Sequence, residues 1–287
     1  MTRRAGDSGI VLVNVLVVLA IAGGLLVVLI SGQDRALLRV AQSAEASIAE
    51  QIALGAEASV IDALRRDLET APEADHFGEP WAQSVLQKET ELPTGRFSVA
   101  IEDMQAKFDI NQLGDLSAGT QSFARRLMLA LDQPPETVNQ IVRILQAVGR
   151  IETLEDLTAF GVSSETVAAL EPHVTALPVP GAVNLNTVGP FLLSVMMQNP
   201  GQSAQLIRLR ESRGALTLET LRGVGALRPQ NSGFTSNVFR VTILAEADRA
   251  RVELETLVVR TGEPGEKRVE IVERRLRSAT ALPPNEP

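Results

Sequence analysis

The chain has 287 residues, enough for one large domain or two smaller ones. Its 27 Lys and Arg residues against 35 Asp and Glu residues give a formal net charge of −8, which disfavours a general attraction to nucleic acid. It has no cysteine, which excludes disulfides and thiol catalysis, and only two histidines, which leave little material for a histidine-based metal centre. This composition favours a structural or interaction protein over an enzyme, and we expect no catalytic, cofactor-binding or metal-ligating residues.

The chain begins with an apolar segment that suits a membrane. Residues 10–30 carry no charge, and a helix rising about 1.5 Å per residue would be about 30 Å long over this run. Arg3 and Arg4 precede the run, so the positive-inside rule places the N-terminus in the cytoplasm. No small-residue cleavage site follows Ile30, as it would in a secretory signal peptide. We therefore expect a transmembrane helix over residues 10–30, and taken alone this run fits a plain single-pass anchor equally well.

The apolar segment continues into an amphipathic one, residues 31–70. Its apolar residues recur at steps of three and four, as in a half-buried helix: Leu37, Ala41, Ala44, Ile48 and Ile52. The pattern ends before Ala71-Pro72. It predicts one long helix whose second half is covered by other elements.

Alternating apolar residues predict strands on both sides of a helical block. Residues 95–113 read as two strands, or as one strand bent at Glu102-Asp103, and further strand patterns occupy residues 237–248, 249–261 and 266–277. Between them, short segments of residues 116–229 have helical periodicity. The simplest topology is an α+β fold in which an antiparallel sheet packs on the long N-terminal helix and an all-α domain is inserted between its strands.

The helical block contains a short internal repeat. The segments TLEDLTAFG (153–161) and TLETLRGVG (217–225) match at their threonines, leucines and glycines: Leu154, Leu157 and Gly161 in the first copy, and Leu218, Leu221 and Gly225 in the second. A threonine can cap the helix start, the leucines share one face, and the glycine suits a tight turn. The second copy resembles the helix-hairpin-helix unit of DNA-binding proteins, whose backbone amides meet a phosphate.

The charge of this block argues against nucleic acid. Residues 115–230 contain nine arginines and no lysine against ten carboxylates, a net charge of −1. A local group of arginines near the second copy keeps one alternative open: Arg208, Arg210, Arg213 and Arg222. That alternative is a membrane-anchored DNA-binding protein, and a hairpin used only for packing is the simpler interpretation.

Other polar groups are weaker candidates. Asp75, His76 and Glu79 could form a metal or acid–base site, but a loop that hydrogen-bonds its own backbone explains them more simply. His173 reads as structural. The carboxylates of Asp103, Asp109 and Asp248 could hold Ca²⁺, but they lack an EF-hand spacing. Asn186 or Thr187 could cap a helix that begins near Pro190.

The leader has a distinctive layout. A short basic segment ends in Gly9 directly before the apolar run, which resembles the signal of type IV prepilins and pseudopilins. The resemblance implies cleavage by a prepilin peptidase between Gly9 and Ile10. Asn14 then stands at mature position five, where most such subunits carry Glu.

Four further segments carry a more specific resemblance: DHFGEPWA, IEDMQAKFDINQL, AVNLNTV and ADRARVELETLVVR. With the leader and the helical insert they resemble the minor pseudopilin K family of the type II secretion system, also called general secretion pathway protein K. Members of this family also lack the usual Glu, so Asn14 agrees with it. Some relatives bind calcium, and no ligand for it can be assigned here.

The resemblance implies a pilin-like domain interrupted by an all-α domain. It implies a non-enzymatic subunit that caps the pseudopilus with minor pseudopilins I and J and supports export of folded proteins. Further implied partners are minor pseudopilin H, the major pseudopilin, the prepilin peptidase and the inner-membrane secretion platform. The protein would sit in the bacterial inner membrane with a single pass, a cytoplasmic N-terminus and a periplasmic globular part.

We expect the chain to begin with a cleaved leader (1–9), a transmembrane helix (10–30) and its amphipathic continuation (31–70). The first part of a pilin-like domain (71–114) follows, and then an inserted all-α domain (115–232). The C-terminal strands of the pilin-like domain (233–277) and a disordered tail (278–287) complete it.

Overall fold

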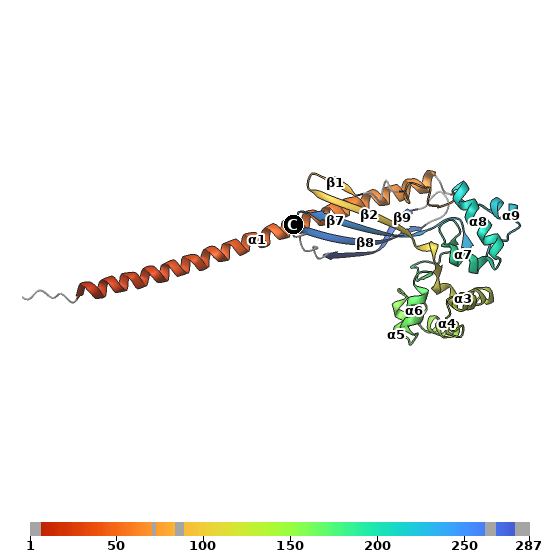
Figure 1. Cartoon of the computed structure of the whole chain (residues 1–287), viewed down its shortest axis with the longest axis horizontal. Helices are drawn as coiled ribbons and strands as arrows, with labels where there is room; N and C mark the ends of the chain where they lie inside the picture. The colour runs from red at the N-terminus through yellow and green to blue at the C-terminus, as the bar shows by residue number, and fades with distance from the viewer. Residues whose placement is uncertain (1–6, 71–72, 84–88, 262–267, 279–287) are drawn as a thin grey trace, which may run out of the picture.

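The computed structural model of the chain describes residues 7–70, 73–83, 89–261 and 268–278. Within the first helix, the side chains of residues 7–11, 28, 30–32 and 34–36 are outside this description. The molecule is a long helical rod that carries a sheet along its C-terminal half and a helical region at the far end (Figure 1). The predicted α+β architecture, with an antiparallel sheet and many helices, is confirmed.

The rod is one helix, α1 (Asp7–Thr70), as the continuous pattern predicts. Its buried residues recur at steps of three and four: Ala49, Ile52, Ala53, Ala56, Val60 and Leu64. The predicted stripe was therefore wrong over its first part, because Leu37, Ala41, Ala44 and Ile48 are exposed. The covered part begins at Ala49, and a Cβ on Gly95, the first residue of β2, would come within 3.0 Å of the Ile52 Cδ1 atom.

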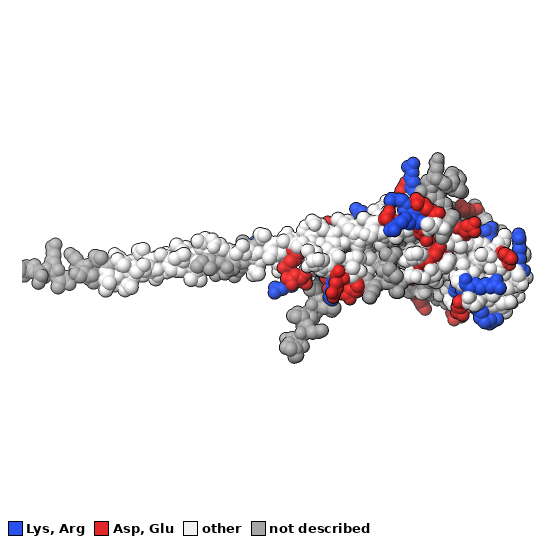
Figure 2. Space-filling model, turned by 90° about the horizontal axis from the view of Figure 1, so that it is seen from above, with Lys and Arg blue, Asp and Glu red and all other residues white. Residues whose placement is uncertain are grey.

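The N-terminal half of α1 stands free of the sheet, and in Figure 2 it is almost bare of charged side chains. Its apolar side chains, such as Leu12, Leu16 and Leu26, are exposed. Among the residues that the structure describes, none of the helices combines the length and apolar character needed to cross a membrane. The transmembrane segment expected over residues 10–30 stays a prediction.

The sheet is antiparallel, with the strand order β1-β2-β7-β8-β9. Its strands are β1 (Thr90–Leu92), β2 (Gly95–Asp103), β7 (Val238–Ala247), β8 (Ala250–Thr261) and β9 (Arg268–Ser278). One face packs on α1, and its inward side chains alternate along the strands as predicted, with Ile101 opposite Val241 and Ile243 opposite Leu254. The sequence pattern missed β1, which is short and exposed. Ser278, the first residue of the predicted tail, still belongs to β9, and residues 279–287 lie outside the described residues.

The chain between β2 and β7 forms the helical region. Its elements are the 3₁₀ helices η1 (Met104–Ala106) and η2 (Ile110–Asp115), the helices α3 (Ala118–Ala130), α4 (Thr137–Val148), α5 (Glu155–Ala159), α6 (Ser164–Leu170), α7 (Pro190–Met197), α8 (Pro200–Arg213) and α9 (Leu218–Gly223), and the two-residue strands β3 (Phe108–Asp109), β4 (Val174–Thr175), β5 (Val183–Asn184) and β6 (Ser232–Gly233). The buried cluster of this region begins at Phe108, upstream of the start expected at residue 115, and continues to Ala226.

The helical region is built from two similar units in tandem. Unit 1 (residues 108–175) is closed by the parallel pair β3–β4, and unit 2 (residues 183–233) by the parallel pair β5–β6. Figure 1 shows α3 to α6 and α7 to α9 as two neighbouring groups, and both contribute to one buried cluster. The duplication is therefore larger than the nine-residue repeat found in the sequence.

Equivalent asparagines brace the two units. Asn111 accepts the N–H of Ile151 at 3.0 Å, and Asn186 accepts the N–H of Leu216 at 2.6 Å. Both donors lie two residues after a positive-φ glycine, Gly149 or Gly214, that ends the preceding helix. The predicted cap of α7, Asn186 or Thr187, was therefore wrong; Gly189 holds that position.

The two repeat glycines end their helices in the same way. Gly161 (φ 89°) donates its N–H to Thr158, and the next residue donates to Leu157. Gly225 (φ 65°) donates to Arg222, and the residue after it donates to Leu221. This pair of bonds is the Schellman arrangement, in which a glycine adopts the left-handed conformation.

Candidate functional site

A buried charged cluster joins the end of α1, the loop that follows it and β8. The Arg260 side chain, 1% exposed, donates from Nη2 to Asp67 Oδ2 at 2.7 Å and from Nη1 to Asp75 Oδ1 at 2.5 Å. It also donates to the carbonyl of Leu64 and lies over the Phe239 ring, 4.7 Å from its centroid. One guanidinium therefore ties three separate segments of the chain together.

The loop of residues 75–81 carries the second part of this cluster. Glu79 Oε2 accepts the backbone N–H of His76 at 2.9 Å and the indole N–H of Trp81 at 2.8 Å. The buried Trp81 ring meets Phe239 edge to face, with centroids 5.1 Å apart. The prediction that this loop hydrogen-bonds its own backbone is confirmed for Glu79 and His76. The prediction did not include the ion pair between Asp75 and Arg260.

Three carboxylates of this cluster, those of Asp67, Asp75 and Glu79, place ligand oxygens within 4.8 Å of one another. Ca²⁺ takes six to eight oxygen ligands. Because two of the three carboxylates are already bound to Arg260, the set fits an ion-paired structural cluster and does not fit a calcium site. Asp67 and Arg260 were not predicted as part of a site, although each is a charged residue on the inward face of α1 or β8.

Burial raises the pKa of Glu79 from its ordinary 4.5 to about 7, and the hydrogen bonds from His76 and Trp81 offset only part of this shift. The nearby charges of Asp67 and Asp75 raise the pKa further. Glu79 Oε1 is buried without a hydrogen-bond partner among the described atoms. Folding therefore makes the ionised form of Glu79 less favourable relative to the protonated form.

The pKa of Glu79 predicts a pH-dependent stability. A carboxyl whose pKa is raised on folding stabilises the fold below its unfolded pKa, and this stability is lost as pH rises from about 4.5 through about 7. The loss is on the order of 3 kcal/mol. Because Trp81 is the only tryptophan and donates to Glu79, its fluorescence should titrate near pH 7, and Glu79→Gln should abolish this titration.

The exposed Glu73, in the segment before this loop, gives the matched control, since Glu73→Gln should leave the titration intact. A titration that persists in Glu79→Gln would contradict the prediction. Unfolding by urea at pH 5 and pH 8 measures the accompanying change in stability.

A second polar cluster joins the sheet to the helical region. Asp103, buried at the end of β2, accepts the hydroxyls of Thr187 at 2.5 Å and Ser236 at 2.6 Å, the Asn184 amide at 3.2 Å and the Gln105 N–H at 2.8 Å. Burial raises the pKa of Asp103, against the lowering effect of these bonds. The side chain thus holds β2, β5 and the segment before β7 in one network.

The other predicted polar residues are not brought together. Asp109 accepts the N–H groups of Asn111 and Leu177, and burial raises its pKa to about 6. Asp248 is exposed in the turn between β7 and β8. Because the Asp103 carboxylate binds Thr187, Ser236 and Asn184, the residues Asp103, Asp109 and Asp248 do not form a common calcium site. His173 is structural, as predicted: it stacks on Phe191 at 4.4 Å.

The hairpin glycines do not present free amides. The N–H groups of Gly161 and Gly225, and of the residues that follow them, donate to carbonyls of their own helices. A helix-hairpin-helix unit that binds DNA leaves such amides for a phosphate. Leu154, Leu157 and Leu221 are buried, whereas Leu218 is 45% exposed. The geometry of the described hairpins therefore favours packing over nucleic-acid binding.

The repeat threonines differ. Thr217 caps α9 in a reciprocal pair with Thr220, as predicted. Thr153 does not cap α5, which has no side-chain cap; the Asp156 carboxylate accepts the N–H groups of Glu152 and Thr153, which precede the helix.

The residues of the expected processing site lie at the start of α1. Gly9 and Ile10 are helical in backbone, and their side chains are outside the description. Asn14 is on the free part of the helix and is exposed. Their expected roles are not tested by this geometry.

Two comparisons place the chain among known proteins. No family model matches it. The type II secretion system protein K of Pseudomonas aeruginosa is 26% identical over 249 residues, which cover 74% of each chain. A chain in the crystal structure of the GspK-GspI-GspJ complex from enterotoxigenic Escherichia coli has a similar fold, with a TM-score of 0.60, 16% identity, and coverage of 84% of this chain and 100% of that one. These matches confirm the resemblance drawn from the sequence: the chain is a relative of the type II secretion system protein K.

Proposed function

We propose that the protein is a non-enzymatic minor pseudopilin that caps the tip of a periplasmic pseudopilus in the type II secretion system. The observation that carries this proposal is the position of the helical region, at the end of the molecule farthest from the apolar rod (Figure 1). A bulky region there would block the addition of another subunit above it. The relation to protein K supports the same role.

The apolar half of α1 supports a membrane anchor. Residues 10–30 are uncharged and helical, and their described apolar side chains are exposed. A helix of this length and composition suits the bilayer core, with the sheet and helical region on the periplasmic side. Removal of residues 1–9 by the prepilin peptidase would leave Ile10 as the mature N-terminus.

Asn14 supports a position at the tip. In an ordinary subunit a Glu at mature position five can neutralise the N-terminal ammonium of a neighbour, and an uncompensated charge in the bilayer costs several kcal/mol. A subunit with Asn14 forfeits this contact. It therefore suits the place in the filament where no subunit lies ahead.

The exposed stripe of α1 between the apolar run and the sheet supports partner binding. Leu37, Ala41, Ala44 and Ile48 are all exposed in the isolated chain. Helices of minor pseudopilins I and J would cover this stripe, as the complex solved for the Escherichia coli relative contains proteins of these names.

Co-expression with a prepilin peptidase and with I- and J-type pseudopilins tests the proposal. The full chain should co-purify with both partners in detergent, and its mass should correspond to a chain starting at Ile10. Leu37→Glu with Ile48→Glu should reduce recovery of the partners at least about tenfold, because two charges would enter an apolar helix contact.

Gln42→Glu with Gln51→Glu provides the matched control, since it adds the same charge at exposed polar positions of the same helix. An unprocessed chain, or a chain that stays monomeric with both partners present, would overturn the proposal.

A further inference from the structure

The two units of the helical region differ at one place. In unit 1, twelve residues separate Gly161 from β4, and seven of them form α6. In unit 2, only six residues separate Gly225 from β6, and none of them is helical. The equivalent strand closes each unit, so unit 2 is built like unit 1 without its fourth helix.

The missing helix leaves apolar side chains uncovered. Leu154 of unit 1 is 8% exposed, whereas its counterpart Leu218 is 45% exposed. Leu227 is 89% exposed and occupies the position of Ser163, the residue that caps α6 in unit 1. Isolated exposed leucines are common, but Leu218 lies where unit 1 buries Leu154, and Leu227 lies where the chain of unit 1 enters α6.

Two arginines flank these leucines. Arg222 lies one turn after Leu218 on the same face of α9, and Arg228 directly follows Leu227. Both are exposed, and neither makes an ion pair or a side-chain hydrogen bond within the described part of the chain. We call Leu218, Arg222, Leu227 and Arg228 the unit 2 surface. It is apolar and basic in a chain whose net charge is −8.

Unit 1 shows what fits this place. Helix α6 is short and acidic, with Glu165 in its first turn, Glu171 at its C-cap and no basic residue. Its apolar face buries Val167 and Leu170 against the unit. An acidic helix with one apolar face complements both the leucines and the arginines of the unit 2 surface.

We propose that the unit 2 surface binds a short acidic amphipathic helix of a partner polypeptide, in the place that α6 fills in unit 1. This site is separate from the exposed stripe of α1 and does not depend on the proposed secretion role. Figure 1 shows α8 and α9 at the end of the molecule opposite the N-terminal end of the rod.

The probe is a fluorescein-labelled, hydrocarbon-stapled peptide of residues 162–172, the α6 segment of this chain. Titrated with the full chain in detergent, it should give a saturable rise in fluorescence anisotropy. Arg222→Glu with Arg228→Glu should weaken Kd at least about tenfold. A peptide carrying Lys in place of Glu165 and Glu171 should lose affinity for the unaltered protein to a similar extent.

Arg143→Glu with Arg277→Glu is the matched control. It changes the net charge equally at two exposed arginines outside unit 2, and it should leave Kd within about twofold. Equal weakening by both double variants would mean general electrostatic attraction and would overturn the proposal. So would the absence of saturation at about 1 mM protein.

A graft guards against a variant that fails to fold. Replacing residues 226–231 with residues 162–173 gives unit 2 its own copy of α6. The grafted chain should keep its circular dichroism and Trp81 emission and should no longer bind the peptide. A folded graft that binds the peptide as well as the unaltered chain would overturn the proposal.

Discussion

Replacing Arg260 with methionine should lower the free energy of unfolding by about 3–5 kcal/mol, a large fraction of the stability of a typical domain. Arg260 is the counter-charge for Asp67 and Asp75, whose side chains are 5% and 4% exposed. Without the guanidinium, both carboxylates stay buried beside Glu79 with no cation, and each carries its full desolvation penalty.

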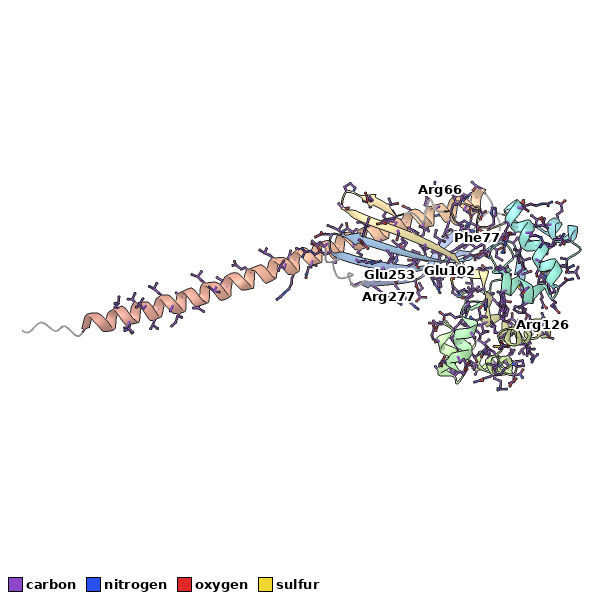
Figure 3. The ribbon with its side chains drawn as sticks, viewed as in Figure 1. Arg66, Phe77, Glu102, Arg126, Glu253 and Arg277 are labelled. Atoms are coloured by element: carbon purple, nitrogen blue, oxygen red, sulfur yellow. The ribbon has the colours of Figure 1, made fainter. Side chains whose placement is uncertain are left out.

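Urea unfolding followed by Trp81 fluorescence measures this loss, because Trp81 packs on Phe239 beside Arg260. Arg277→Met is the control, since Arg277 is exposed on β9 (Figure 3) and should change stability by less than about 0.5 kcal/mol. Arg260→Lys should recover only part of the stability, because the ammonium of a lysine cannot donate to Asp67 and Asp75 in the fixed planar geometry of the guanidinium. Full stability of Arg260→Met would show that the cluster contributes little.

Replacing Asp103 with alanine should cost about 2–4 kcal/mol and loosen the helical region from the sheet. The substitution leaves the hydroxyls of Thr187 and Ser236 and the amide of Asn184 without their buried acceptor. Limited proteolysis should then cleave near residues 104–107 or 234–237, the two connections between sheet and helical region, faster than in the unaltered protein.

Glu102 supplies a neighbouring control on the same strand. It is exposed on the sheet (Figure 3) and pairs with Lys107 and Arg240, each at 3.4 Å. Glu102→Ala should cost less than about 1 kcal/mol, because exposed ion pairs contribute little. If Asp103→Ala and Glu102→Ala had equal effects on stability and proteolysis, the proposed role of Asp103 would be wrong.

Periodicity predicted most of the elements correctly, since the three long C-terminal strands and the helices of the insert each follow a period of two or about 3.6 residues. It failed on the coverage of α1. The stripe through Leu37 and Ile48 has the same period as the buried one, and the extent of the sheet decides which part is covered. Local sequence carries no measure of that extent.

The buried polar clusters were harder to predict because their partners are distant in sequence. Asp67 and Arg260 are 193 residues apart, and Asp103 and Ser236 are 133 apart. The sequence pattern placed each of these polar residues at an inward position, but it did not indicate which residue would be its partner. The duplication was also underestimated, because the equivalent asparagines Asn111 and Asn186 lie far upstream of the repeated glycines.

The ion pair between Glu57 of α1 and Arg274 of β9 has a consequence for how the chain folds. The two residues are 217 positions apart, and Glu57 is buried with Thr256 as its other partner. The helical region lies within contiguous sequence between β2 and β7, so it can form as soon as its own residues are available. The sheet cannot be completed until the last strand arrives, since only then is the charge on Glu57 compensated. A chain emerging N-terminus first would therefore order its insert early and its sheet last.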